Sequence, residues 1–473
     1  MSGIYPKRVM LAAPCSGSGK TTVTCALLEV LKSRGLDPVS YKCGPDYIDP
    51  LFHKKVLGIE SRNLDVYFEG EDGIRDIISS CGEGYAVAEG VMGIYDGIYP
   101  DSQAGSCYEI AELSETPVIL TVNASGTGRT VISLVRGILS DDTSRLIKGI
   151  IMNRMSRSFY DLLKPVFDKE ISSFRDDVRL LGFMPECRDI SVESRHLGLK
   201  LPYEIDDIKA KVRKAASLLE ETVDIGAVLS IMEKAPHQTA DKASDHKEEN
   251  EKALSDTGEG LTLAVAYDDA FCFYYRDNLD IFEEHGVRTV FFSPLKDREI
   301  PEEADGLLFG GGYPEEHLLE LSDNRTMLDS VKRAINKGMP SLAECGGFMY
   351  LHRTVRDIKG RSFEMAGVID GECAYSGHLV RFGYMRLKRV NVPYASDELY
   401  RSLAGIKGHE FHYYDSSCSG EACIAEKPSG SRSWGCMSVN KNGIWGFPHF
   451  YYRSAPSFIT EFVKRMRSVK NSG

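Results

Sequence analysis

Short apolar runs alternate with longer segments of helical periodicity between Lys7 and about Gly182. The segment 21–35, which directly follows the first apolar run, has apolar residues at helical spacing and predicts an amphipathic helix. The predicted strands of this half are 8–14, 38–43, 85–91, 117–123 and 147–153. Regular alternation of strands and helices predicts an α/β domain, a doubly wound parallel sheet with helices on both faces.

The apolar periodicity is lost between residues 233 and 259, in a stretch rich in Ala, Lys, Asp, Glu and Ser. We interpret this stretch as a linker. A second alternation follows it, with strand-and-turn candidates at 261–271, 287–295, 306–314, 340–348 and 443–452. The prediction is therefore a first domain at 1–232, a flexible linker at 233–259, a second α/β domain at 260–460 and a C-terminal tail at 461–473.

Composition narrows the class of protein. The 473 residues are 42% apolar and 27% charged, without an apolar run of about 20 residues or a signal peptide, so we expect a cytoplasmic protein without a membrane partner. The twelve cysteines show no paired metal-binding spacing and are expected to be thiols. A formal charge of −12 argues against nucleic acid as a partner.

The segment APCSGSGKTT, residues 13–22, lies between a predicted strand and a predicted helix. Glycine-rich loops in this position direct backbone N–H groups and a helix N-terminus at phosphate oxygens. Lys20 is expected to reach the terminal phosphates, and the Thr21 hydroxyl to bind Mg²⁺. Pro14 replaces the first glycine of the usual phosphate-loop pattern. The other candidate ATP contacts in the loop are Ser16, Gly17, Gly19 and Thr22.

Polar residues follow three further predicted strands, at the sheet edge where open α/β sheets bind ligands. Asp46 and Glu89, beside Thr21, are predicted to complete the Mg²⁺ site, because Mg²⁺ prefers oxygen ligands. The alternative for each is a turn or helix-cap role, but their shared position beside the phosphate loop favours the metal role. Asp49 and Asp96 are left open between these roles. Asn153, at the end of a later strand, is a candidate for reading the adenine edge of ATP, with a turn or cap as the alternative.

A second motif, SLAECGGFMY, places Cys345 at a tight turn between a predicted strand and a predicted helix. The helix N-terminus is expected to lower the pKa of the thiol and so favour a nucleophile. The turn LLFGGGYPEE, with Gly311 and Gly312, and the residue Gly346 are candidate N–H donors to an oxyanion.

His449, in GFPHFYY, is the preferred general base for this thiol. His409 and His412, in GHEFHYY, compete for that role and are equally able to contact substrate or to pack in the core. The residues that follow His449 are aromatic, so no carboxylate nearby in the sequence completes a triad. The sequence predicts a Cys–His pair.

These motifs together resemble the cobyrinate a,c-diamide synthase family of glutamine-dependent amidotransferases. The resemblance covers roughly residues 8–457 apart from the linker, and it includes YKCGPDYIDPLFH, AVAEGVMGIYDG, LFGGGYPE, LAECGGFMYL, GHEFHY and PHFYYRSAPSF. GPDYIDP together with EGVMGIYDG is specific to this group. The resemblance implies an N-terminal domain similar to dethiobiotin synthetase and a C-terminal class I glutamine amidotransferase domain.

The resemblance also implies a reaction. ATP would activate a peripheral carboxylate of a tetrapyrrole as an acyl phosphate, and ammonia released from glutamine at Cys345 and His449 would convert it to an amide. The implied cofactor is Mg²⁺, the co-substrates are ATP and glutamine, and a homodimer is compatible with the family. The residues implied for binding the acyl phosphate and substrate are Lys42, Asp46, Tyr47, Asp49 and Asp96. His53 and Arg62 are further candidates, for which a structural role is an equal alternative.

Two alternatives remain at this point. The same chemistry on hydrogenobyrinate or Ni-sirohydrochlorin uses shared motifs and is poorly separated by sequence. A regulatory ATPase similar to partitioning proteins would explain the phosphate loop but would leave Cys345, the glycine turn and His449 without a role.

Overall fold

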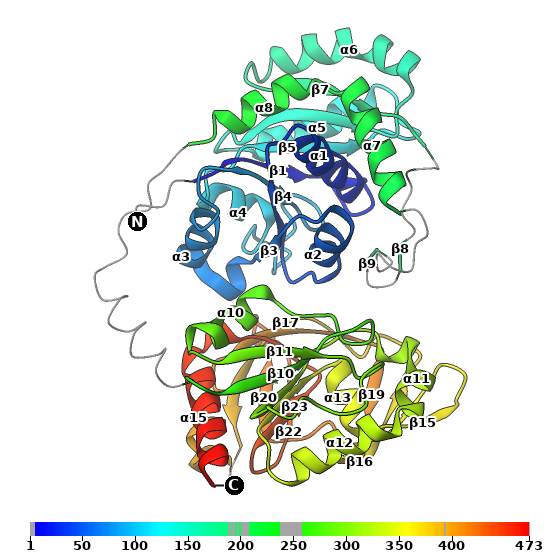
Figure 1. Cartoon of the computed structure of the whole chain (residues 1–473). Coiled ribbons are helices and arrows are strands. Elements are labelled where there is room, and N and C mark those ends of the chain that lie inside the picture. Colours follow the sequence, from blue (N-terminus) through cyan, green and yellow to red (C-terminus); the bar gives the residue numbers. More distant parts are fainter. Residues whose placement is uncertain are drawn as a thin grey trace. The chain divides into compact units, whose positions relative to one another are not determined.

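The computed structural model describes residues 5–187, 190, 194–195, 198–199, 208–236, 258–391 and 394–472. The chain divides into two compact units, Met1–Ala243 and Ser244–Gly473 (Figure 1). The division falls within the predicted linker at 233–259, of which residues 237–257 lie outside the described part of the chain.

Unit 1 is built on a seven-stranded sheet of order β3-β2-β4-β1-β5-β6-β7, in which every neighbouring pair is parallel. The strands are β1 (Lys7–Ala12), β2 (Val39–Cys43), β3 (Ser61–Leu64), β4 (Tyr85–Glu89), β5 (Val118–Asn123), β6 (Ile147–Asn153) and β7 (Arg179–Met184). All five strands predicted for this half are present, and the two short strands β8 (Ser194–Arg195) and β9 (Gly198–Leu199) form a separate antiparallel pair.

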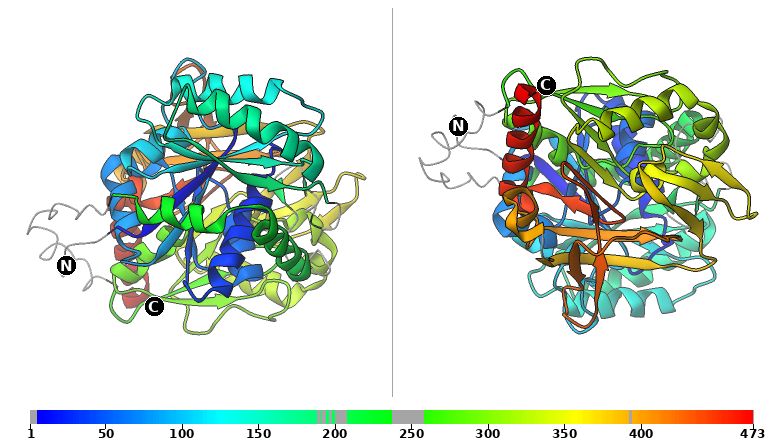
Figure 2. Two further views of the ribbon diagram at one scale, coloured as in Figure 1. Left: turned by 90° about the horizontal axis from the view of Figure 1, so that it is seen from above. Right: turned by 90° about the horizontal axis from the view of Figure 1, so that it is seen from below.

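Helices cover both faces of this sheet, as Figures 1 and 2 show, and each face has its own apolar core. One core contains α3 (Val66–Ser79), α4 (Cys107–Leu113), α5 (Thr130–Asp141) and α6 (Arg157–Ser172). The other contains α1 (Lys20–Ser33), the end of α2 (Ile48–Phe52), a π-helical turn (His53–Leu57), α7 (Ile208–Thr222) and α8 (Ile225–Glu233). The doubly wound architecture predicted from the alternation is confirmed.

Unit 2 contains a six-stranded sheet of order β11-β10-β12-β13-β23-β22, parallel except for the β22–β23 pair. Its strands are β10 (Thr262–Ala266), β11 (Arg288–Phe292), β12 (Gly306–Phe309), β13 (Ser341–Glu344), β22 (Ser438–Val439) and β23 (Gly443–Gly446). Among the described residues of the unit, the α-helices are α10 (Arg276–Glu284), α11 (Leu318–Asp323), α12 (Arg325–Asn336), α13 (Gly346–Leu351), α14 (Glu398–Arg401) and α15 (Pro456–Ser472).

Two smaller sheets complete unit 2. The four-stranded sheet has the order β15-β14-β16-β19, and the five-stranded sheet has the order β21-β20-β17-β18-β24. Their strands are β14 (His352–Arg356), β15 (Ser362–Glu364), β16 (Ile369–Tyr375), β17 (Arg381–Val390), β18 (Lys407–His412), β19 (Tyr414–Ser416), β20 (Cys423–Glu426), β21 (Ser433–Cys436) and β24 (His449–Tyr451). The segment 443–452, predicted as one strand and turn, thus supplies β23 and β24 to two different sheets.

The predicted tail at 461–473 is corrected by the structure. Helix α15 (Pro456–Ser472) runs without a break to Ser472, and Phe462, Val463 and Met466 are buried in the core of unit 2. The apolar residues repeat at intervals of three and four, so they form the buried face of an amphipathic helix.

Candidate active sites

The phosphate loop joins β1 to the N-terminus of α1. Gly17 and Gly19 adopt left-handed backbone angles, with φ of +76° and +90°. A Cβ atom on Gly19 would lie 2.0 Å from Nδ2 of Asn153, so only glycine fits there. That same amide nitrogen donates a hydrogen bond of 2.8 Å to the carbonyl of Ser18. Asn153 therefore supports the loop itself, and its contact with adenine stays a prediction.

Lys20 is buried at the start of α1. Its amine donates hydrogen bonds to the carbonyl oxygens of Met92, at 2.6 Å, and of Cys15, at 3.4 Å. Burial, followed by the charge of Lys42, lowers the pKa of Lys20. The acceptors of the Lys20 amine are therefore neutral carbonyl groups. A negatively charged phosphate oxygen would accept a stronger hydrogen bond from it.

Glu89 lies at the end of β4 and is completely buried. Its Oε1 accepts hydrogen bonds from the Thr21 hydroxyl at 2.5 Å and from the Lys42 amine at 3.0 Å. Burial raises the pKa of Glu89 to about 7, and the charge of Asp49 acts in the same direction. The predicted neighbours Thr21 and Glu89 are thus in direct contact, with Lys42 beside them.

Lys42 also forms an ion pair with Asp49, and it lies 3.9 Å from Oδ2 of Asp46. Oδ1 of Asp46 accepts hydrogen bonds from the backbone N–H groups of Ile48, at 2.8 Å, and Asp49, at 3.2 Å. Burial raises the pKa of Asp46 to about 6. One carboxylate oxygen of Asp46 therefore caps the turn before α2, and its role as a metal ligand stays a prediction.

The remaining acyl-phosphate candidates differ in accessibility. Asp96 is exposed, and its Oδ2 accepts a hydrogen bond of 2.8 Å from the backbone of Gly93. Tyr47 is buried directly before α2. His53 is completely buried, shares a hydrogen bond of 2.8 Å with Ser40 and lies 3.7 Å from Oε2 of Glu89. These contacts support a structural role for His53 instead of contact with the substrate.

Thr21 and Glu89 fit a hard divalent cation. They bring two oxygens together at the phosphate-binding end of α1, and Oε2 of Glu89 is buried without a hydrogen-bond partner among the described residues. Within the same part of the chain, no group of three His, Cys, Asp or Glu residues could hold a metal alone. This arrangement suits Mg²⁺, which is commonly bound by one or two protein ligands together with phosphate oxygens.

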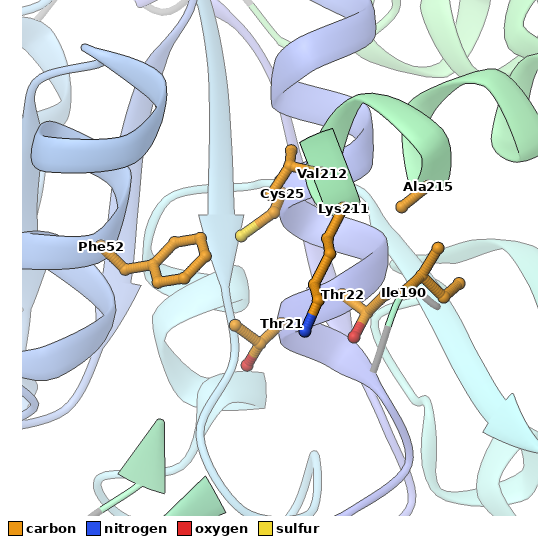
Figure 3. Close-up of a pocket in the computed structure, with 8 residues that line it drawn as sticks. All are labelled: Thr21, Thr22, Cys25, Phe52, Ile190, Lys211, Val212 and Ala215. Carbon is orange, nitrogen blue, oxygen red and sulfur yellow. The ribbon is translucent and has the colours of Figure 1, made fainter. Parts of the chain in front are cut away.

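A small cavity beside α1 includes one cation that the sequence did not indicate. Lys211 of α7 extends toward the end of α1 that carries Thr21 and Thr22 (Figure 3). No hydrogen-bond or ion-pair partner of Lys211 is found in the described ranges. Lys211 lies in IKAKVRK, where nothing distinguishes it from the neighbouring lysines. The cavity is lined by Thr21, Thr22, Cys25, Phe52, Ile190, Lys211, Val212 and Ala215.

In unit 2, Cys345 forms a strained turn between β13 and α13. Its φ of +46° and ψ of −102° are unfavourable for a residue with a side chain, and its N–H donates a hydrogen bond of 2.8 Å to the carbonyl of Gly446. Strain of this kind is typical of functional turns. The turn predicted around Cys345 is present, and the residue is partly exposed.

The expected lowering of the Cys345 pKa is wrong. Packing around the sulfur raises the pKa of the thiol, and the charges of Glu315 and Glu410 act in the same direction. Helix α13 has only six residues, and its N-terminus does not outweigh these effects. The resting thiol is therefore protonated and requires a base.

His449 is the first residue of β24 and is buried. Its ring packs on Gly311, where a Cβ atom would lie 2.3 Å from Cε1 of the imidazole. Burial, followed by the charge of His409, lowers the pKa of His449. The imidazole is consequently neutral at physiological pH, the form that accepts a proton.

The three candidate oxyanion glycines lie together. A Cβ atom on Gly346 would lie 3.2 Å from the backbone nitrogen of Gly312 and 2.9 Å from Cδ of Pro314, so the cysteine turn packs directly on the glycine turn that contains Gly311. The N–H of Gly346 also forms a hydrogen bond to Cys345. This arrangement brings backbone donors next to the thiol, and their action on an oxyanion stays a prediction.

The two competing histidines have other neighbours. His409 stacks on His449 with ring centres 5.0 Å apart and an interplanar angle of 16°. His412 stacks on Phe447 at 4.0 Å and forms a hydrogen bond of 3.0 Å with Glu410. His449 is thus the histidine that packs against the glycine turn, which favours it as the base.

Comparison with known proteins assigns a family domain to each of the two units. Residues 9–199 match a CobQ/CobB/MinD/ParA nucleotide binding domain, and residues 262–454 match a CobB/CobQ-like glutamine amidotransferase domain. A cobyrinate a,c-diamide synthase from Caldanaerobacter subterraneus subsp. tengcongensis is 34% identical over 97% of this chain and 98% of its own length. The chain belongs to the cobyrinate a,c-diamide synthase family.

Further members of the family are similarly close over their whole length. The synthase from Clostridium tetani is 33% identical over 97% of this chain and 100% of its own, and that from Picrophilus torridus is 33% identical over 98% and 99%. The fold class and the enzyme class predicted from the sequence, a glutamine-dependent amidating ligase, are confirmed. Among the described residues, helices of the length and apolarity needed to cross a membrane are absent.

Proposed function

We propose that this chain uses ATP and glutamine to convert the a and c carboxylate side chains of cobyrinate into amides, a step of cobalamin biosynthesis. The name shared by the full-length relatives supports this substrate. The observation that carries the chemistry is that one chain combines two features. Its phosphate loop is in contact with the buried Glu89, which also binds Lys42, and its strained Cys345 turn packs on the glycine turn against which His449 lies.

Unit 1 would activate the substrate. A carboxylate oxygen of the macrocycle attacks the γ-phosphorus of ATP, the bond to the β-phosphate oxygen breaks, and an acyl phosphate and ADP result. Lys20 exchanges its two carbonyl partners for phosphate oxygens and neutralises their charge. Thr21 and Glu89 would hold Mg²⁺, which when bound supplies further positive charge beside the phosphates.

Unit 2 would release ammonia. His449 takes the proton of the Cys345 thiol, and the sulfur attacks the side-chain amide carbon of glutamine. The N–H groups of Gly311, Gly312 and Gly346 would stabilise the oxyanion, a role supported by the close packing of the two glycine-containing turns. His449 then returns the proton to the departing nitrogen, so that ammonia leaves and a γ-glutamyl thioester remains, which water hydrolyses to glutamate.

Ammonia completes the reaction by attacking the acyl phosphate and displacing phosphate. The acyl phosphate also reacts with water, so ammonia must reach it first. The two halves therefore predict different dependences: glutamine hydrolysis needs Cys345, and amide formation from any nitrogen source needs the ATP site of unit 1.

Mass spectrometry of cobyrinate incubated with the purified chain, ATP, Mg²⁺ and glutamine tests the proposal. Two successive exchanges of a carboxylate for an amide are expected. Unchanged cobyrinate beside measurable glutamine hydrolysis would contradict the assigned substrate. Parallel reactions with hydrogenobyrinate and Ni-sirohydrochlorin then identify which macrocycle is amidated.

A further inference from the structure

The nucleophile and the base of unit 2 come from different sheets. Cys345 follows β13 in the six-stranded sheet, whereas His449 begins β24 at the edge of the five-stranded sheet. The two are linked along the chain, because Gly446, which accepts the N–H of Cys345, ends β23 three residues before His449. This link brings His449 near the cysteine turn and leaves the position of its imidazole to the contacts of β24.

Glu344 makes such a contact. It directly precedes Cys345, and its side chain is buried. Oε1 of Glu344 accepts a hydrogen bond of 2.7 Å from the hydroxyl of Tyr452, and the carboxyl group also accepts one from the backbone N–H of Phe450. Phe450 is the residue after His449, so the carboxyl group links the two residues that neighbour the nucleophile and the base.

Asn278 of α10 holds the same stretch of β24. Its amide nitrogen donates a hydrogen bond of 2.6 Å to the carbonyl of Phe450, and its oxygen accepts one of 2.8 Å from the N–H of Tyr452. Both backbone groups of Phe450 are thus bound by side chains from outside the five-stranded sheet. An edge strand otherwise leaves such groups without partners on one side.

Burying the carboxyl group of Glu344 at this position costs free energy of folding. Among the described residues Glu344 has no ion-pair partner, and burial raises its pKa to about 8. An apolar side chain would avoid this cost unless the hydrogen bonds to β24 were needed. The energetic cost of burying Glu344, its position next to Cys345 and its hydrogen bonds to Phe450 and Tyr452 together indicate a role in the active site.

We propose that Glu344 is a positioning residue for glutamine hydrolysis, whose carboxyl group holds β24 and thereby the ring of His449 against the turn of Cys345. It provides the orienting carboxyl group that is missing after His449 in the sequence, and it acts through the backbone of the base strand instead of on the imidazole. The inference rests on the proposed glutaminase role of Cys345 and His449.

The test compares Glu344→Met, which keeps the volume and removes the acceptor oxygens, with Glu344→Gln, which keeps one acceptor. For the purified full-length chain, we would measure kcat and KM for glutamine hydrolysis and the pH dependence of Cys345 alkylation by iodoacetamide. Glu426→Gln is the matched control, because Glu426 is a buried carboxylate of unit 2 that pairs with Arg386 and Lys388 instead of β24.

We expect Glu344→Met to lower kcat by roughly tenfold to hundredfold, the range that a misplacement of about 1 Å produces, with KM changed less than about twofold. The pH midpoint of alkylation should rise, since the base no longer meets the thiol. Glu344→Gln should recover most of kcat, and Tyr452→Phe should show a smaller loss.

Two failures are distinguishable. If wild-type protein hydrolyses no glutamine, or alkylation of Cys345 leaves hydrolysis intact, the proposed function of unit 2 is wrong. If wild type is active and folded Glu344→Met matches it in kcat and alkylation midpoint, the role of Glu344 alone is overturned. Should Glu344→Met fail to fold, Tyr452→Phe decides: an unchanged kcat and midpoint would overturn the proposal.

Discussion

The candidate ATP site of unit 1 and the candidate cysteine site of unit 2 are assembled from different kinds of contact. In unit 1 the phosphate loop follows β1, and Lys42 and Glu89 lie at the ends of β2 and β4 in the same parallel sheet. Glu89 accepts hydrogen bonds from both Thr21 of the loop and Lys42. In unit 2 Cys345 follows a strand of one sheet and His449 begins a strand of another. Their surroundings meet where glycines pack closely and where Tyr452 donates a buried hydrogen bond to Glu344.

This difference has a physical consequence. Side chains at the carboxyl ends of neighbouring parallel strands are close because the sheet itself places them there. Side chains on separate sheets depend on every contact between those sheets, so small changes there should be felt strongly. Mutations in the two units should therefore separate the ATP-dependent step from glutamine hydrolysis. The activity of unit 2 should respond more strongly to changes in side-chain packing.

Removing the nucleophile should give the largest effect. Cys345→Ala should lower glutamine hydrolysis by roughly 10⁴-fold or more, because no other group can form the thioester. Amidation of the macrocycle with ammonium salts in place of glutamine should continue at the wild-type rate. The comparison would fail if ammonium-dependent amidation were lost together with hydrolysis.

The ATP site should show the opposite pattern. Lys20→Ala or Glu89→Gln should reduce amidation from either nitrogen source by at least roughly hundredfold, since both remove charge that faces the phosphates or the cation. Glutamine hydrolysis measured without ATP should persist in both variants. Amide formation by Lys20→Ala with ammonium would contradict the proposed role of the loop.

A single methyl group tests how tightly the two sheets are joined. Gly311→Ala places a Cβ atom 2.3 Å from Cε1 of His449, so the imidazole must leave its present position. We expect kcat for glutamine hydrolysis to fall by about 10- to 100-fold. Gly435→Ala is the control, because its nearest contact would be an ordinary 3.6 Å. Equal kcat values in the two variants would show that the site tolerates displacement of the ring.

The sequence predicted the two sites unequally for the same reason. Asp46, Glu89 and Thr21 could be placed together because strand ends in a parallel sheet share an edge, and local patterns identify those ends. The split of residues 443–452 between two sheets, and hence the contact of His449 with Gly311, depends on long-range pairing that no local pattern encodes. The Cys345 pKa was misjudged because burial was invisible in the sequence.

Two further residues escaped sequence reasoning because their partners are distant along the chain. Glu344 is separated from Tyr452 by 108 positions. Lys211 belongs to a helix whose packing beside α1 follows only from the fold. In both cases the residue type gives no signal in the sequence, and the proposed role follows from contacts that exist only in the folded chain.

Stability against pH should reveal the buried carboxyl group of unit 2. The pKa of Glu344 is raised to about 8 in the folded state from 4.5, so the folded state retains a proton that the unfolded state loses. Its contribution to folding therefore weakens as pH rises from about 4.5 to about 8. Between pH 5 and pH 8, the Tm of wild type should fall relative to that of Glu344→Gln by about 2–5 °C. Parallel Tm curves would contradict this account.

The smallest expected effect concerns Lys211. Its amine lines the cavity beside Thr21 and Thr22, at a helix N-terminus that disfavours a cation unless an anion is bound. ATP phosphates would supply that anion, so Lys211→Ala should weaken ATP binding by about 3- to 10-fold, as measured by calorimetry. Lys209→Ala, on the same helix but exposed, should bind like wild type. If both variants bound ATP equally well, Lys211 would have no part in ATP binding. The ATP site would then consist of the phosphate loop and the strand ends of one sheet, in sharper contrast with the two-sheet site of unit 2.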